Sequence, residues 1–201
     1  MNKLKRKHRR ILAYIFDMLI MIIAVILIHN IIPRSSNVAN LNTELNNIND
    51  LLFSKKINLL TYYNRYSTVV HSVDKENILY SIMDAIYILI YFVIIPTFAH
   101  GKTLGKKIFN IKVVKTDKSK LTCDDLLMRS MVVNGLLYLL FSLVAVFVFS
   151  DIIYFAIEII LGIIQTFLLI TSVFMVIYRK DDKGLQDLLA KTRVVDDNEV
   201  K

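Results

Sequence analysis

Four long apolar runs alternate with polar segments along the chain. The runs occupy approximately residues 11–32, 78–98, 130–149 and 152–178. Each is long enough for a membrane-spanning α-helix, which needs ~20 mostly apolar residues to cross a hydrocarbon core. Only Ser150 and Asp151 separate the third run from the fourth, so we expect a tight helical hairpin there. The pattern predicts an all-α integral membrane protein with four transmembrane helices.

The segments between the runs carry weaker patterns. In segment 33–77, apolar residues recur at spacings of three and four, which predicts an amphipathic helix (Val38, Leu41, Leu45, Ile48, Leu52). Across barely two heptads, we expect this stripe to pack on the protein's own surface and not to form a coiled coil. In loop 99–129, residues 111–114 predict a short strand, and residues 192–195 in the tail 179–201 predict a second one that can pair with it. We therefore expect a small β-containing cap beside the helices.

Lysine and arginine are unevenly distributed over the segments outside the runs. The N-terminal tail carries six, loop 99–129 eight and tail 179–201 six, whereas segment 33–77 carries five, of which only Arg34 and Lys75 lie near predicted membrane ends. Because basic residues favour the cytoplasmic side, we expect cytoplasmic termini, a cytoplasmic loop and cap, and an extracytoplasmic helical segment. The formal charge of +8 flanks apolar runs, so anionic lipid headgroups, and not nucleic acid, are the expected partner.

Composition and motifs exclude several other classes of protein. Hydrophobic residues make up 55% of the 201 positions, and the mean hydropathy is +0.52, outside the usual range of soluble domains. The lone Cys123 excludes an internal disulfide framework and a cysteine-based zinc site. Residues 100–107 are not a phosphate-binding Walker A loop, since three residues separate the glycines and Lys107 replaces the required Ser or Thr. With no hydrolase or nucleotide fingerprint in the sequence, we expect no enzyme activity, no cofactor and no metal site.

Four polar or ionisable residues inside the predicted spans are candidates for function: Asp17, Asp84, Glu158 and Gln165. Charged groups in hydrocarbon are costly and by default indicate function. At 1.5 Å per residue, Asp84 and Glu158 lie roughly 9 Å from the outer ends of their runs, and Asp17 lies roughly 9 Å from the cytoplasmic end of its run. Gln165, near mid-span, would bridge the two levels. The four residues therefore predict a pathway for protons or small cations, because buried carboxylates have raised pKa values.

A structural role is the alternative for these charges. Asp17 lies seven residues from Arg10 on nearly the same helical face, so an ion pair of Asp17 with Arg10, Arg129 or Arg179 would fix the helix register. We expect such a pair for Asp17. For Asp84 and Glu158 the functional and structural interpretations both stay open, and His29 is expected to be an interfacial residue.

Three motifs, each weak alone, are specific in combination. They are Arg10-x-x-Ala13-x-x-x-Asp17, Gly101-x-Thr103-x-Gly105-Lys106 running into residues 111–114, and Gly184-Leu-Gln186-Asp187-Leu-Leu-Ala190, with Arg129 between the second and the third. In these motifs the chain resembles the RDD family of small bacterial membrane proteins, named for an arginine and two aspartates. The resemblance covers nearly the whole chain apart from segment 33–77. In place of this chain's Gln186, the family commonly has histidine.

The resemblance implies a multi-pass protein of the bacterial inner membrane. It also implies a structural or functional role for the motif residues Arg10, Asp17, Gly101, Thr103, Gly105, Lys106, Arg129 and Asp187. The family is usually described in terms of transport, and some members are linked to sodium/proton antiport.

Transport of a small solute or ion is the hypothesis that joins these observations. Its most concrete form is cation/proton exchange through Asp17, Asp84, Glu158 and Gln165. Because four helices enclose little cavity, we expect transport to require a homo-oligomer. The alternative is a non-transporting membrane adaptor that docks a protein partner through residues 101–114 and the outer helical segment.

Overall fold

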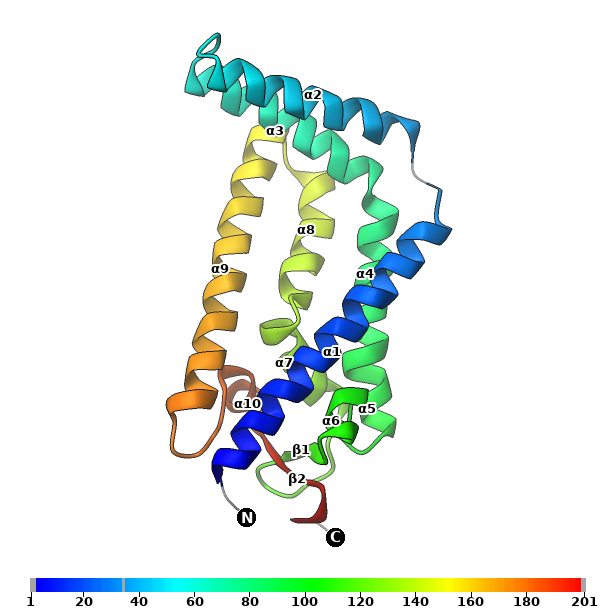
Figure 1. Ribbon diagram of the computed structural model, residues 1–201, viewed down its shortest axis with the longest axis vertical. Helices are drawn as coiled ribbons and strands as arrows, with labels where there is room; N and C mark the ends of the chain where they lie inside the picture. Colours follow the sequence, from blue (N-terminus) through cyan, green and yellow to red (C-terminus); the bar gives the residue numbers. More distant parts are fainter. Residues whose placement is uncertain (1–2, 34, 200–201) are drawn as a thin grey trace.

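The computed structural model describes residues 3–33 and 35–199, and long apolar helices run along its length (Figure 1). Within these ranges, three helices are long and apolar enough to cross a membrane, or four if one bent pair counts as a span. The three are α1 (Lys3–Ile31), the segment made of α4 (Ile78–Leu89), a π-helical turn (Ile90–Ile94) and α5 (Ile95–Phe98), and α9 (Asp151–Tyr178). The bent pair is α7 (Cys123–Val133) and α8 (Leu136–Val148).

The single helix predicted for residues 130–149 is divided between the two members of that pair. Their axes differ by 78°. Gly135 stands at the break with φ +72°, in the left-handed region that favours glycine, and a Cβ there would meet nothing within 4 Å. The backbone angle, and not a lack of space, therefore selects glycine. The bend turns α7 toward α10 (Leu185–Leu189) and brings Arg129 to the C-terminal segment.

A helical hairpin of α2 (Ser36–Phe53) and α3 (Leu59–Glu76) lies across one end of the bundle, called the hairpin end below (Figure 1). The helix expected from the apolar stripe is confirmed, and it packs on α3 of the same chain, with Val38 and Ile48 buried. His71 of α3 fixes the hairpin to the bundle. Its ring nitrogens lie 2.6 Å from Asp151 Oδ1 and 2.8 Å from the carbonyl oxygen of Val146.

The opposite end, called the sheet end below, carries a two-stranded antiparallel sheet (Figure 1). Its strands, β1 (Ile111–Lys115) and β2 (Thr192–Asp196), confirm both predicted strands and their pairing. Val113 pairs with Val194, and both pack with Ala13 of α1 in one apolar cluster. Gly101, with φ +80°, lies so close to this strand that a Cβ would be 2.1 Å from the carbonyl oxygen of Val113. The short helix α6 (Leu104–Ile108) and a 3₁₀ turn (Asp197–Glu199) complete this end.

Candidate functional site

Asp17 is buried in the bundle, with 1% of its surface exposed. The Tyr91 hydroxyl and the Gly105 backbone N–H donate to Asp17 Oδ1 at 2.6 and 2.8 Å, and the Thr103 hydroxyl donates to Oδ2 at 2.6 Å. All three donors are uncharged. The predicted ion pair of Asp17 with an arginine is therefore wrong, because neutral donors from two other segments occupy its carboxylate.

The second sequence motif builds the short helix α6, which supplies two of these donors. The Thr103 hydroxyl accepts the backbone N–H of Lys106 at 3.3 Å and so caps the helix while it donates to Asp17. Gly105 lets α6 approach α1 at the backbone, since a Cβ there would lie 2.4 Å from the carbonyl oxygen of Ala13. The motif thus serves to bring α6 against Asp17.

Asp187, from the third motif, is also buried and has 0% of its surface exposed. Arg10 and Arg129 donate to different oxygens of this carboxylate, and the Gly184 backbone N–H adds a bond of 2.8 Å. The carboxylate therefore joins α1, α7 and α10, and Arg129 also donates to the Thr192 hydroxyl of β2. Burial raises the pKa of Asp187, but the two arginines lower it more, and the pKa lies below its ordinary value.

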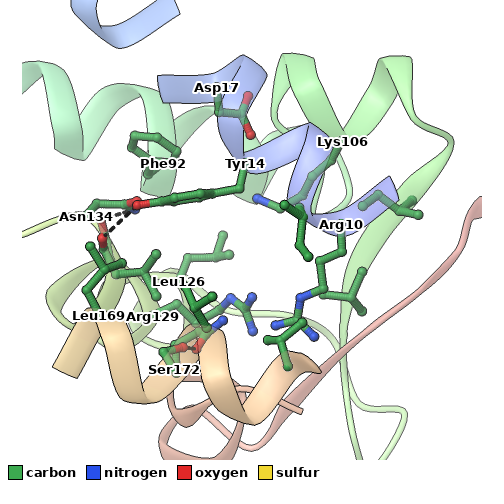
Figure 2. Close-up of a pocket in the computed structure, with 18 residues that line it drawn as sticks. Arg10, Tyr14, Asp17, Phe92, Lys106, Leu126, Arg129, Asn134, Leu169 and Ser172 are labelled. Carbon is green, nitrogen blue, oxygen red and sulfur yellow. Dashed lines mark hydrogen bonds between the residues drawn. The ribbon is translucent and has the colours of Figure 1, made fainter. Parts of the chain in front are cut away.

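A partly open cavity of about 130 Å³ lies between these groups (Figure 2). Its polar lining consists of Arg10, Tyr14, Asp17, Lys106, Arg129, Ser130, Asn134, Ser172 and Gln186. Most of the remaining wall is apolar and comes chiefly from α1, α7 and α9. A water molecule needs ~10–15 Å³ on this scale, so the cavity has room for several waters or for one polar group of a ligand.

Lys106 lines the cavity without a carboxylate partner. In the part of the chain that the structure describes, no carboxylate oxygen lies within the 4.0 Å of an ion pair from its Nζ. Figure 2 shows its side chain entering from α6, across the cavity from Arg10 and Arg129. Burial lowers the pKa of Lys106 to about 8; Asp17 raises it, and the two arginines lower it further. At neutral pH the cavity therefore holds a cation that its own carboxylates only partly compensate.

The other residues of the predicted pathway lie in separate contacts. Asp84 is 3.0 Å from His29 Nε2, near the hairpin end of α1. Glu158 accepts a hydrogen bond of 2.7 Å from Tyr138, and Gln165 donates to a backbone carbonyl of α7 at 3.0 Å. Among the described residues, no hydrogen bond or ion pair joins Asp17, Asp84, Glu158 and Gln165 to one another.

A second polar pocket, at the hairpin end, contains a carboxylate that the sequence analysis missed. Asp74 of α3 and Glu158 of α9 both line it, and the Tyr154 hydroxyl donates to Asp74 at 2.9 Å. Burial raises the pKa of Asp74, the Tyr154 bond lowers it, and the charge of Glu158 raises it, with a net upward shift. Asp74 was assigned to an outer segment because the apolar run begins only at Ile78, although its helix continues almost directly into that run.

Comparison with known protein families identifies one family that covers most of the chain. The sequence model of the RDD family matches residues 6–191. The comparisons with curated proteins and with solved structures return no match. The matched range includes Asp17, Asp187, the helix α6 and every candidate span. The chain therefore belongs to the RDD family of proteins.

Proposed function

We propose that this protein transports a small solute or ion across a membrane and that the sheet-end cavity is its solute site. One observation carries the proposal: Arg10, Arg129, Lys106 and Asp17 surround open space at the end of apolar helices. Ionisable groups at such positions are costly and are typical of substrate or ion pathways. A partly open cavity with a few convergent polar groups is also the usual form of a ligand site.

The distribution of basic residues supports an orientation for this transport. Loop 99–129 and the tail 179–201, which build the sheet end, hold most of the lysine and arginine outside the spans. Under the positive-inside rule this end is cytoplasmic in a bacterial inner membrane, and the α2–α3 hairpin covers the outer end. The solute site then faces the cytoplasmic leaflet, where anionic headgroups meet the basic residues.

A transport path across the membrane requires a second polar site, and the hairpin-end pocket is a candidate for it. Asp74 and Glu158 are close enough there for the charge of each to act on the other, which suits the uptake and release of a proton. The two cavities share no lining residue in the described part of the chain. We therefore propose that transport uses a homo-oligomer or a movement at the Gly135 bend to connect them, and that cation/proton exchange is the form to test first.

Flux in proteoliposomes tests the proposal. Purified protein is reconstituted with a pH-sensitive dye inside, a pH gradient is imposed, and Na⁺ or Li⁺ is added outside. We expect the dye signal to recover further after addition of the cation than it does in empty vesicles. This recovery should be lost in the double variant Asp74→Asn/Glu158→Gln. Asp50→Asn is the matched control, because Asp50 is an exposed carboxylate on α2. Folded wild-type protein without any solute-dependent flux would contradict transport.

A second candidate function, the non-transporting adaptor, is favoured by one surface. Phe53, Leu59 and Leu60 are 82, 74 and 71% exposed around the tip of the α2–α3 hairpin. Exposed apolar patches are typical of docking surfaces. The basic loop is less suited to docking than predicted, since Lys102 and Lys112 both pair with Asp197.

Cross-linking in cells separates the adaptor from the transporter. A partner recovered in stoichiometric amount with the wild type, and lost with Phe53→Ser/Leu60→Ser, would support the adaptor. Unchanged flux in the same double variant would support the transporter.

A further inference from the structure

We infer that the sheet-end cavity binds the anionic phosphate headgroup of a membrane lipid, whose acyl chains lie between α1 and α9. The inference rests on the proposed function in taking this cavity as the ligand site, and it names the substrate class. The argument depends on the charge balance of the cavity, its unused hydrogen-bond donors, its apolar side and its position along the helices.

The cavity carries an excess of positive charge. Three cations, Arg10, Arg129 and Lys106, stand against two carboxylates, Asp17 and Asp187. Asp17 is already satisfied by three neutral donors, and Asp187 is shared between the two arginines. One further negative group would balance the set, so the expected ligand is an anion.

The donors needed to hold an anion are present and unused. A guanidinium has five N–H groups, yet Arg129 makes hydrogen bonds only through Nη1 within the described chain. Its Nε and Nη2 remain for a ligand, and Figure 2 places the Arg129 side chain at the cavity. Lys106 adds an ammonium with no ion-pair partner in the same part of the structure. A guanidinium fork beside an ammonium is suited to the several oxygens of a phosphate.

The other side of the cavity is apolar and is lined largely by two helices, α1 and α9. α1 and α9 meet near Lys7, whose Nζ donates to the carbonyl oxygen of Ile177 at 2.7 Å, and they diverge from there toward the hairpin end (Figure 1). Tyr14 and Leu169 line the cavity beyond this contact, together with Val173, which is 41% exposed on the outside of the bundle. A small hydrophilic solute would leave this wall uncovered, whereas acyl chains would cover it.

The cations lie at the depth of lipid phosphates. Arg10 directly precedes the first apolar run, and Ser172 of the cavity wall is six residues before the end of α9 at Tyr178. At 1.5 Å per residue, that places the polar lining roughly 9 Å from the helix end. The hydrocarbon core is ~30 Å thick within a bilayer of ~40–45 Å, so a headgroup reaches this level without crossing the core.

Binding of defined amphiphiles to the purified full chain in detergent tests the inference. The probes are dihexanoylphosphatidylglycerol, its zwitterionic analogue dihexanoylphosphatidylcholine, glycerol 3-phosphate and inorganic phosphate, measured by calorimetry. We expect the phosphatidylglycerol to bind at least about tenfold more tightly than each of the others, since glycerol 3-phosphate and inorganic phosphate have no acyl chains to cover the apolar wall, and the choline cation of the phosphatidylcholine would lie beside the cations of the cavity. Equal binding of inorganic phosphate would indicate a free-anion site, and equal binding of the phosphatidylcholine would indicate a nonspecific apolar surface; either result overturns the inference.

Two neighbouring lysines provide a matched pair of variants. Lys106→Met should weaken phosphatidylglycerol binding about tenfold or more, whereas Lys107→Met, which removes an exposed charge from the same helix, should leave it unchanged. If Lys106→Met does not fold, Lys106→Arg is used in its place. Phosphatidylglycerol binding to Lys106→Arg should persist at pH values at which the wild-type protein no longer binds it. Equal loss in Lys106→Met and Lys107→Met would overturn the site.

These assays can refute the ligand site and the transport function separately. Phosphatidylglycerol binding that depends on Lys106, without flux of any solute, would refute transport and keep the ligand site. Solute flux that persists in Lys106→Met, with no selective phosphatidylglycerol binding, would refute the ligand assignment and keep transport.

Discussion

Replacing Asp17 with alanine removes the acceptor of three buried donors at once. The donors are the hydroxyls of Tyr91 and Thr103 and the backbone N–H of Gly105. A buried donor left without a partner costs ~1–3 kcal/mol, so three would cost ~3–9 kcal/mol without relaxation. Asp17 borders a cavity with room for water, and both hydroxyls can rotate, so we expect the lower end, a loss of ~3 kcal/mol in the free energy of unfolding.

Asp17→Asn separates the hydrogen bonds from the charge. The amide oxygen can still accept from Tyr91 and Gly105, and the amide nitrogen can donate to the Thr103 hydroxyl oxygen. The variant loses only the extra hydrogen-bond strength that a charged acceptor provides. We therefore expect a smaller loss in the free energy of unfolding, ~1 kcal/mol. A neutral asparagine that preserves stability also permits a direct test of Asp17 in transport.

Chemical unfolding in mild detergent, followed by the helical circular dichroism signal, measures both costs, since the chain has no tryptophan for fluorescence. Asp84→Ala is the control, because Asp84 is a partly exposed carboxylate whose one hydrogen bond or ion pair among the described residues is with His29. We expect Asp17→Ala to lose more stability than Asp17→Asn or Asp84→Ala. Equal stability of Asp17→Ala and wild type would refute the assignment of the three bonds.

Three further predictions use the same measurement. Gly105→Ala should cost ~1–3 kcal/mol because its Cβ would contact the α1 backbone, whereas Gly162→Ala, with open space around it in α9, should be neutral or stabilising by up to ~1 kcal/mol. Asp187→Asn should cost ~3–5 kcal/mol, since it leaves two buried arginines without a carboxylate. Because the pKa of Lys106 is lowered to about 8 from 10.5, stability should rise with pH between these values, and this rise should vanish in Lys106→Met.

The periodic features of the fold were predictable from the sequence because each depends on residues that are close together. The three unbroken candidate spans follow from apolar run length, the two strands from short alternating segments, and α2 from its stripe. The start of α7 depends on equally local contacts, since Thr122 and Asp125 form a capping box within one turn. Predicting these elements required no knowledge of tertiary contacts.

The partners of the buried carboxylates were not predictable in the same way. Asp17 and Arg10 share a face of α1, which favoured an ion pair, yet the donors to Asp17 are at least 74 residues away and include a backbone N–H. Arg10 instead bonds to Asp187, 177 residues away. The spacing of residues along a helix indicates which side chains can meet within that helix. It does not indicate whether a residue from another segment binds one of those side chains instead.

The Gly135 bend was missed for a related reason. The apolar run continues across it, and run length is the signal that predicts a span. The available indication was the pair Asn134–Gly135, since both residue types tolerate the left-handed backbone that glycine adopts here. The bend matters for the site, because a straight helix would not direct α7, and with it Arg129, toward α10.

The two buried carboxylates of the family motifs have different partners, and that difference leaves the cavity positively charged. Asp187 is bound by two cations, whereas the described residues that bind Asp17 are all neutral donors. If Asp17 instead formed an ion pair with Lys106, the ammonium would be neutralised, and only the two arginines that already bind Asp187 would remain for a ligand. Holding Asp17 through a threonine, a tyrosine and a backbone N–H fixes α6 against α1 while keeping the charge of Lys106 available. The motifs therefore position a cation beside an open cavity, which is why an anionic headgroup is the ligand that the geometry favours.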